Sequence, residues 1–289
     1  MSERVIKAGV IGWPVEHSLS PIIHNYWLKK YGINGTYERI AVHPDRLGDE
    51  LKRLADEGYA GVNVTIPHKE RVLEFVDEIE KHAQAIGAVN TITFKDGKIY
   101  GDNSDVMGFH GLLVPAEAKD AKLLSHGHRN CAVVIGAGGA ARAVIWELWR
   151  IKFLQEILIF NRTISRAEKI KNDFGGDRLK VCAWEELEEK ISSADILVNA
   201  TSLGMKGQSP LEINLENLPK SSYVVDIVYN PRETELLKQA TKLGIKNIGG
   251  LDMLIWQAML GFHQWFKWKE NLELTPELRQ LLIDELQKR

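Results

Sequence analysis

The sequence predicts an α/β protein with two domains: an N-terminal α/β domain and a Rossmann-type, doubly wound domain, with a cleft between them. A chain of 289 residues is long for a single hydrophobic core. Short apolar segments of strand length alternate with amphipathic segments of helix length, which is typical of α/β folds. The apolar run at residues 131–135 leads directly into a glycine-rich turn, as in dinucleotide-binding domains.

The composition favours a globular protein with a small-molecule ligand. A formal net charge of -2 and a pI near 6.5 give no basic surface for nucleic acid or an anionic membrane. No apolar stretch approaches the ~20 residues of a membrane span. Cys131 and Cys182 lie in or near apolar runs and offer no disulfide framework, so we expect core residues and a reducing cytoplasm.

The first domain is predicted from strands and helices that alternate up to about residue 105. The Asp96-Gly97 turn predicts a hairpin between its last two strands. The expected strands are residues 5–11, 36–42, 61–66, 87–94 and 99–101, and the expected helices are residues 22–31, 45–57 and 70–86.

The strand that begins at Gly61 carries the first functional signal. Apolar residues alternate with Asn63 and Thr65 until Pro67 stops the run, and Lys69 follows. Asparagine and threonine suit a hydrogen-bonding cleft, and ligands bind at the carboxyl ends of strands in such sheets. Taken alone, the segment could also be an ordinary edge strand followed by a solvated lysine.

Two serines precede the first predicted helix. Ser20 followed by Pro21 is a typical helix start, with serine as N-cap and proline at the first helical position. Ser20 could be a cap and nothing more. However, the hydroxyls of Ser18 and Ser20 stand beside free N–H groups at the positive end of a helix dipole, which favours an anion such as a carboxylate.

Residues 115–129 have weak periodicity and form the expected lead-in to the second domain. His126 and His128 could ligate a metal ion. Because no acidic or cysteine partner accompanies them, we expect a loop there and no metal site.

The turn that runs from Gly136 to Ala141 has the G-x-G-x-x-A form of the dinucleotide fingerprint. A helix at residues 140–151 and a strand at 156–160 complete a βαβ unit. The glycines let the backbone approach a pyrophosphate at the helix N-terminus. A glycine-rich turn without a ligand is the weaker alternative in this context. We expect cofactor contacts from Gly136, Ala137, Gly138, Gly139 and Ala140.

The residues after the second strand of this unit select the cofactor. An NAD enzyme usually has an acidic residue there to hold the ribose 2′-hydroxyl. This chain has Asn161, Arg162 and Thr163, with Arg166 one helical turn later. Guanidinium groups bind a 2′-phosphate in bidentate fashion, so the sequence predicts NADP(H).

Further strands are expected at residues 180–183, 196–200, 223–227 and 246–248, with helices between them. Small polar residues follow two of these strand ends, where a ribose or nicotinamide would lie. From Met253 to Trp268 the chain reads as a helix whose aromatic face packs on the first domain or in a dimer contact. The residues expected at the ligands are Asn199, Thr201, Ser202, Tyr229, Gly250, Met253 and Gln257.

Taken together, these motifs resemble the shikimate dehydrogenase family over nearly the whole chain. The resemblance rests on Ser18-Leu-Ser20-Pro21, the segment from Asn63 to Lys69, Gly87-Ala-Val-Asn90-Thr, Gly101-Asp-Asn-Ser-Asp105, the glycine fingerprint, Asn161-Arg162-Thr163 with Arg166, Asn199-Ala-Thr-Ser, and the segment from Met253 to Ala258.

The resemblance implies reversible, NADPH-dependent reduction of 3-dehydroshikimate to shikimate. It implies a substrate domain of residues 1–106 plus 251–289 and an NADP domain of residues 107–250, in a monomer or homodimer. Lys69 and Asp105 would form the catalytic pair, although Lys69 could instead only orient a substrate hydroxyl. Ser18 and Ser20 would bind the carboxylate; Asn63, Thr65, Asn90, Asp105 and Gln257 would hold hydroxyls; Tyr229 and Met253 would line the site.

Two positions depart from the family pattern. Val106 and Asp252 stand where glycine is usual, which leaves the fine substrate preference open. The rival predictions are a quinate-accepting enzyme of the same fold and, in another class, a non-catalytic NADP- or shikimate-binding sensor. The chain keeps Lys69 and Asp105 and has no added DNA-binding segment, which disfavours the sensor.

Overall fold

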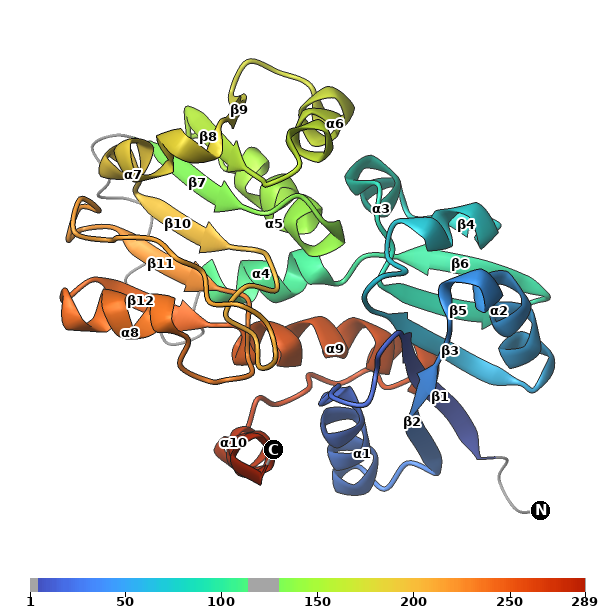
Figure 1. Cartoon of the computed structure of the whole chain (residues 1–289). Coiled ribbons are helices and arrows are strands. Elements are labelled where there is room, and N and C mark those ends of the chain that lie inside the picture. The colour runs from blue at the N-terminus through green and yellow to red at the C-terminus, as the bar shows by residue number, and fades with distance from the viewer. Residues whose placement is uncertain (1–4, 114–129, 289) are drawn as a thin grey trace. The chain divides into compact units, whose positions relative to one another are not determined.

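The computed structural model describes residues 5–113 and 130–288, so His126 and His128 lie outside the described residues. The chain divides into two compact units (Figure 1). Unit 1 comprises residues 1–105 and 255–289, and unit 2 comprises residues 106–254. Within the described residues no helix is long and apolar enough to cross a membrane.

Unit 1 is built on a mixed sheet with the strand order β2-β1-β3-β5-β6-β4. The first three of these strands are parallel, and β3, β5 and β6 are antiparallel to their neighbours in turn. The predicted hairpin between β5 and β6 is confirmed. The strands are β1 (Ile6–Gly12), β2 (Gly35–Ala41), β3 (Tyr59–Val64), β4 (Glu78–Ile79), β5 (Thr91–Lys95) and β6 (Lys98–Asp102).

Apolar side chains cover both faces of this sheet. Helix α2 (Leu47–Asp56) buries three leucines, one on each turn of its inner side, against Val62 and Val64 of β3. Aromatic residues of α1 (Ser20–Lys30) and α9 (Leu251–Phe266) pack together, and the indole of Trp265 donates to the carbonyl of Ile92 on β5 at 2.9 Å. The prediction that the aromatic face of the C-terminal helix packs within the first domain is therefore confirmed.

The predicted helix at residues 70–86 is wrong. The segment forms a 3-10 turn (Arg71–Phe75), the short strand β4 and then helix α3 (Lys81–Ile86). The edge of β6 offers unpaired backbone groups, and the N–H groups of Asp77 and Glu80 donate to the carbonyls of Ile99 and Gly101 at 2.9 Å. Pairing with a distant strand thus overrides the helical pattern of the local sequence.

Unit 2 contains a parallel sheet with the strand order β12-β11-β10-β7-β8-β9, which is the order of a Rossmann fold. The strands are β7 (Cys131–Ile135), β8 (Glu156–Phe160), β9 (Leu179–Cys182), β10 (Ile196–Asn199), β11 (Tyr223–Asp226) and β12 (Lys246–Gly249); the helices are α4 (Asp105–Leu113), whose first residue belongs to unit 1, α5 (Gly139–Arg150), α6 (Ile164–Phe174), α7 (Leu187–Lys190) and α8 (Glu235–Lys242).

Both faces of the parallel sheet are buried, as a doubly wound fold requires. Alternate residues of β7 enter different clusters: Ala132 and Val134 pack with α5 and α6, whereas Cys131, Val133 and Ile135 pack with α7 and α8. The prediction of Cys131 as a core residue is confirmed, while Cys182 is only partly buried. The predicted α/β class with a Rossmann-type domain is correct.

Two details of the predicted helices are wrong. Between β10 and β11, residues 200–222 are all described and contain no helix, because glycines, prolines and turns occupy most of this stretch. The C-terminal helix α9 ends at Phe266, where Lys267 takes a positive φ of 55°, so Trp268 lies outside it. A further helix, α10 (Pro276–Lys288), follows.

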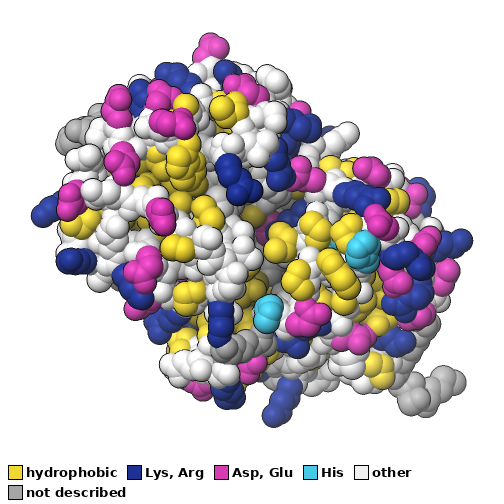
Figure 2. Space-filling model, viewed as in Figure 1, with side chains coloured by type: hydrophobic (Ala, Val, Ile, Leu, Met, Phe, Trp, Pro, Cys, Tyr) yellow, Lys and Arg dark blue, Asp and Glu magenta, His cyan; other side chains and the backbone are white. Residues whose placement is uncertain are grey.

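Charged side chains of both signs are intermixed on the face drawn in Figure 2. This mixture agrees with the formal net charge of -2.

Candidate active site

Lys69 and Asp105 form a close ion pair in unit 1. Lys69 follows β3, where its carbonyl accepts from the N–H of Val89 at 2.8 Å. Asp105 is the first residue of α4, and its N–H donates to Asn103 Oδ1 at 3.1 Å. The Lys69 Nζ atom lies 2.5 Å from Asp105 Oδ2, with 14% and 6% of these side chains exposed. The ammonium is thus directed by a charge-assisted hydrogen bond.

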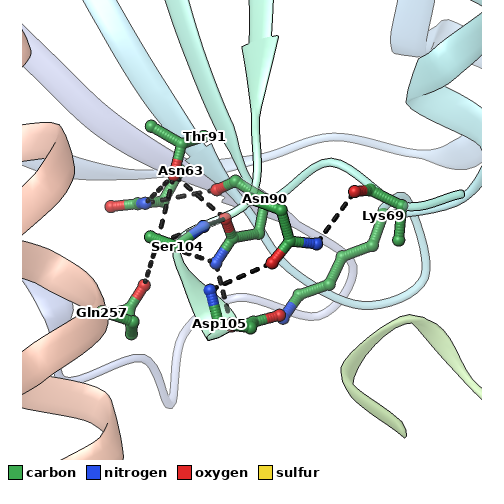
Figure 3. Close-up of polar contacts among 9 residues, drawn as sticks. Asn63, Lys69, Asn90, Thr91, Ser104, Asp105 and Gln257 are labelled. Atoms are coloured by element: carbon green, nitrogen blue, oxygen red, sulfur yellow. Dashed lines mark hydrogen bonds and ion pairs between the residues drawn. The ribbon is translucent and has the colours of Figure 1, made fainter. Parts of the chain in front are cut away.

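Asn90 holds the other oxygen of the aspartate (Figure 3). Its amide Nδ2 donates to Asp105 Oδ1 at 2.8 Å, and its Oδ1 accepts from the backbone N–H of Ser104 at 2.7 Å. Because the amide and the carboxylate are both buried, each fixes the direction of the other. Asp105 therefore has one oxygen on Lys69 and one on Asn90.

Asn63 and Gln257 extend this network. Asn63 Nδ2 donates to the carbonyl of Asn90 at 3.2 Å, and the hydroxyl of Ser104 donates to Gln257 Oε1 at 3.4 Å. Thr91 Oγ1 donates to Asn90 Oδ1 at 3.0 Å. Thr65, one residue past β3, is half-buried. The structure thus brings Asn63, Lys69, Asn90, Asp105 and Gln257 into one polar cluster.

Sequence reasoning missed two members of this cluster, Thr91 and Ser104. Both belong to motifs that carry the family resemblance, beside Asn90 and Asp105 respectively. Their small hydroxyls carry no functional signal of their own, since threonine and serine are common in strands and turns. Thr91 is next to Asn90 in the chain, but only the pairing of β5 with β6 shows that the Ser104 hydroxyl also meets the Asn90 amide.

The two serines occupy the start of α1 differently from the prediction. Ser20 is the first helical residue and makes no capping bond, so the prediction that it is the N-cap is wrong. Ser18 Oγ instead accepts from the N–H of Ser20 at 3.3 Å, because it stands two residues before that donor. Pro21 lies in the first turn, as predicted. The carbonyl of Ser18 accepts two bonds from the Arg39 guanidinium.

The glycine turn in unit 2 has the geometry of a phosphate cradle. Gly136 has a φ of 120°, and a Cβ atom there would lie 2.8 Å from the carbonyl oxygen of Ala200. Gly138, the N-cap of α5, has open space at its Cβ position, with nothing within 4 Å. A diphosphate could therefore approach bare backbone at the start of a 12-residue helix. Ala137, Gly139 and Ala140 complete the turn, so the residues present fit a dinucleotide.

The predicted 2′-phosphate residues surround the start of α6. Thr163 is the N-cap of this helix, and Asn161 Nδ2 donates to the Thr163 carbonyl at 2.8 Å. Arg162 and Arg166 are exposed. Two guanidinium groups at the positive end of a helix fit a phosphate dianion well.

Asn199 is fully buried and shapes the loop after β10. It donates to Asp226 Oδ1 at 2.9 Å, and its Oδ1 accepts from the N–H and hydroxyl of Thr201 at 3.1 and 2.7 Å. Burial raises the pKa of Asp226 to about 6, although a hydrogen bond from Thr234 opposes the shift. With no exposed surface, Asn199 can act on a cofactor only by holding Thr201 and the loop.

The remaining predicted residues of unit 2 lie on the loops after its strands or at the start of α9. Ser202 is exposed and Tyr229 is half-buried, whereas Met253 is buried in the core of unit 2. Gly250 packs tightly, since a Cβ atom there would lie 2.0 Å from the carbonyl oxygen of Ile227. Val106 is buried on α4 and Asp252 is half-buried on α9. Within residues 5–113 and 130–288, no three His, Cys, Asp or Glu side chains could hold a metal ion.

Two family models match the chain. The model described as the shikimate dehydrogenase substrate binding domain matches residues 10–92, and that of shikimate / quinate 5-dehydrogenase matches residues 119–252. The shikimate dehydrogenase (NADP(+)) of Methylocella silvestris is 44% identical over 100% of this chain and 99% of its own length.

Solved structures agree with these matches. The shikimate 5-dehydrogenase of Thermus thermophilus, solved with NADP(H) and shikimate, is 33% identical with a TM-score of 0.79, covering 98% of this chain and 100% of that one. The quinate dehydrogenase of Corynebacterium glutamicum, solved with NAD, is 30% identical with a TM-score of 0.83, covering 97% and 99%. The chain belongs to the shikimate dehydrogenase family.

Proposed function

We propose that this protein catalyses the reversible, NADP(H)-dependent reduction of 3-dehydroshikimate to shikimate, a step towards the aromatic amino acids. The observation that carries the proposal is the buried pair of Lys69 and Asp105, joined at 2.5 Å and tied to Asn90. A lysine that served only solubility would have no reason to be 14% exposed and fixed on a carboxylate. Relatives that match the whole chain carry the name of this activity.

Lys69 acts as the proton donor in the direction of reduction. NADPH, when bound, supplies the hydride that reduces the substrate carbonyl. The oxygen at that carbon then needs a proton, and an ammonium held in place is a suitable donor. Asp105 accepts one hydrogen bond from Lys69, which orients the ammonium.

Polar residues of unit 1 recognise the substrate in this proposal. Ser18 and Ser20 bind the carboxylate at the start of α1, where helix N–H groups favour an anion. Asn63, Thr65, Asn90, Asp105 and Gln257 hold the hydroxyls, with Tyr229 of unit 2 lining the substrate site. This makes residues 1–106 plus 251–289 the substrate domain.

Residues 107–250 form the NADP-binding domain in the same proposal. The glycine turn receives the diphosphate, and Arg162 with Arg166 receives the 2′-phosphate beside Asn161 and Thr163. The loops after β10 and β12 receive the nicotinamide half through Thr201, Ser202, Gly250 and Met253. We further propose a cytoplasmic enzyme that is a monomer or homodimer.

The test is the rate of NADPH formation, followed by its ultraviolet absorbance, with shikimate or quinate and with NADP or NAD in all four combinations. Turnover confined to shikimate with NADP supports the proposal. Turnover of quinate would move the protein to a broader specificity and direct attention to Ser18, Ser20 and Asp252. A folded protein that binds NADP but turns over no pair would be a sensor, and the proposal would be wrong.

A further inference from the structure

A buried phenol is hydrogen-bonded to one of the proposed substrate-binding side chains. Tyr37 lies on β2 and is 3% exposed. Its hydroxyl donates to Asn63 Oδ1 at 2.6 Å. Burial holds the pKa of this phenol well above its usual value, so it remains a protonated donor. No motif of the sequence pointed to this residue.

The structure fixes Tyr37 on three sides. The backbone of Tyr37 exchanges two hydrogen bonds with the Asn25 side chain of α1, at 2.9 and 3.1 Å. The His24 ring stacks on the phenol ring, with centroids 3.9 Å apart and planes 3° from parallel. Burial lowers the pKa of His24 to about 3, so the stack contains a neutral imidazole.

The hydroxyl of Tyr37 sets the direction of the Asn63 amide. Since the phenol donates, it must face the amide oxygen rather than the amide nitrogen. Asn63 Nδ2 then points to the carbonyl of Asn90 at 3.2 Å and, more weakly, to Thr91 Oγ1 at 3.5 Å. Without the phenol hydroxyl the amide could turn over, because an amide's oxygen and nitrogen ends have nearly the same shape.

We propose that Tyr37 is a positioning residue for substrate recognition: it holds Asn63 so that the amide presents an N–H donor. Tyr37 itself does not touch the substrate. This inference rests on the proposed function, which assigns Asn63 to shikimate. It adds a residue of β2 that determines substrate specificity through Asn63 and not through its own contact with the ligand.

The test is Tyr37→Phe, which removes the hydroxyl and keeps the ring on His24. We expect the dissociation constant for shikimate, measured by calorimetry, to rise roughly three- to tenfold, which is the value of one neutral hydrogen bond. The KM for shikimate should rise in parallel, while kcat and the KM for NADP stay within about twofold. In an Asn63→Ala background the same change should have a much smaller effect, since the two residues act as a unit.

Tyr59→Phe is the matched control, because Tyr59 lies on β3 of the same sheet and its hydroxyl donates to Glu38 instead. That variant should keep the wild-type affinity for shikimate. The inference is overturned if Tyr37→Phe binds shikimate like wild type, or if its effect persists in full in the Asn63→Ala background. Binding without turnover in the wild type would refute the proposed function alone, since the calorimetric comparison would still stand.

Discussion

The Lys69 ammonium and the Asp105 carboxylate are both withdrawn from water and have their charges matched at 2.5 Å. Removing one partner from such a pair leaves a buried charge without compensation, which is usually far more costly than losing an exposed ion pair. Asp105 would keep its bond from Asn90, whereas the Lys69 ammonium has no second partner among the residues that the structure describes. Substitution of Lys69 therefore leaves a carboxylate that still has one partner, whereas substitution of Asp105 leaves an ammonium that has lost the partner shown here.

Lys69→Ala tests the proton donor. We expect kcat to fall by roughly two to four orders of magnitude, the usual value of general acid–base catalysis, and shikimate affinity to change far less. Steady-state kinetics with a calorimetric titration separates the two. Lys98→Ala, which removes an exposed lysine paired with Glu78, is the control. An unchanged kcat in Lys69→Ala would show that this residue only orients the substrate or has no role.

The cofactor preference is also a property of single residues. Arg162→Ala and Arg166→Ala should each raise the KM for NADP by roughly tenfold or more, because each loses charged hydrogen bonds to the 2′-phosphate. The KM for NAD, which lacks that phosphate, should change little. Lys169→Ala removes a positive charge from the same helix and should leave the NADP preference intact. Equal losses with both cofactors would contradict the assignment.

At the scale of elements, the sequence predicts best what depends on neighbouring residues. Apolar runs such as β7, followed by a glycine turn and a helix, require little from the rest of the chain, and the βαβ unit is found where it is predicted. The segment 70–86 was wrongly predicted as one helix because β4 exists only where β6 offers it an edge. The side-chain pattern of residues 70–86 does not indicate that part of this segment pairs with β6.

The residues of the candidate site also fall into two groups: those that the local sequence predicts and those that only the fold reveals. Lys69 and Asn90 belong to recognisable local motifs, so the sequence alone predicts them as site residues. Tyr37 and Ser104 acquire their roles from strands and helices far away in sequence, through bonds to Asn63 and Asn90. A tyrosine in a strand is ordinarily a packing residue, so its hydroxyl bond could not be predicted from the sequence.

The glycine turn provides a prediction for an element. Gly136→Ala should lower the melting temperature and abolish NADP binding, because a φ of 120° strains any L side chain and the added carbon meets the Ala200 carbonyl at 2.8 Å. Gly138→Ala has ordinary backbone angles and open space around it, so the fold should be retained. If that space receives the diphosphate, Gly138→Ala should still weaken NADP binding. Wild-type NADP affinity in Gly138→Ala, measured by calorimetry beside the melting temperature, would place the cofactor elsewhere.

At the scale of the whole molecule, each unit buries an ionisable group, and the two groups respond to pH with opposite signs. His24 in unit 1 is fully buried, and burial lowers its pKa from 6.5 to about 3. Its contribution to stability is complete above pH 6.5 and is lost as the pH falls towards 3. Burial raises the pKa of Asp226 in unit 2 from 3.8 to about 6, so unit 2 gains stability as the pH falls through that range.

Lowering the pH from about 7 to about 5 should therefore destabilise unit 1 through His24 by about 2 kcal/mol while stabilising unit 2 through Asp226 by about 1 kcal/mol. Hydrogen exchange followed by mass spectrometry, corrected for the intrinsic pH dependence, separates peptides of β2 and β3 from those of β10 and β11. His82 opposes the effect within unit 1, because its bond to Asp102 raises its pKa and adds stability at low pH.

The comparison of wild type with His24→Phe removes that complication, since His82 is present in both proteins. The variant keeps an aromatic ring on Tyr37 but has no proton to bind, so protection of unit 1 should decline less on acidification than in wild type. Unit 2 should respond alike in the two proteins. An unchanged pH response of unit 1 in His24→Phe would mean that the imidazole is not held neutral by burial. The interpretation of His24 as a neutral ring stacked on Tyr37 would then be wrong.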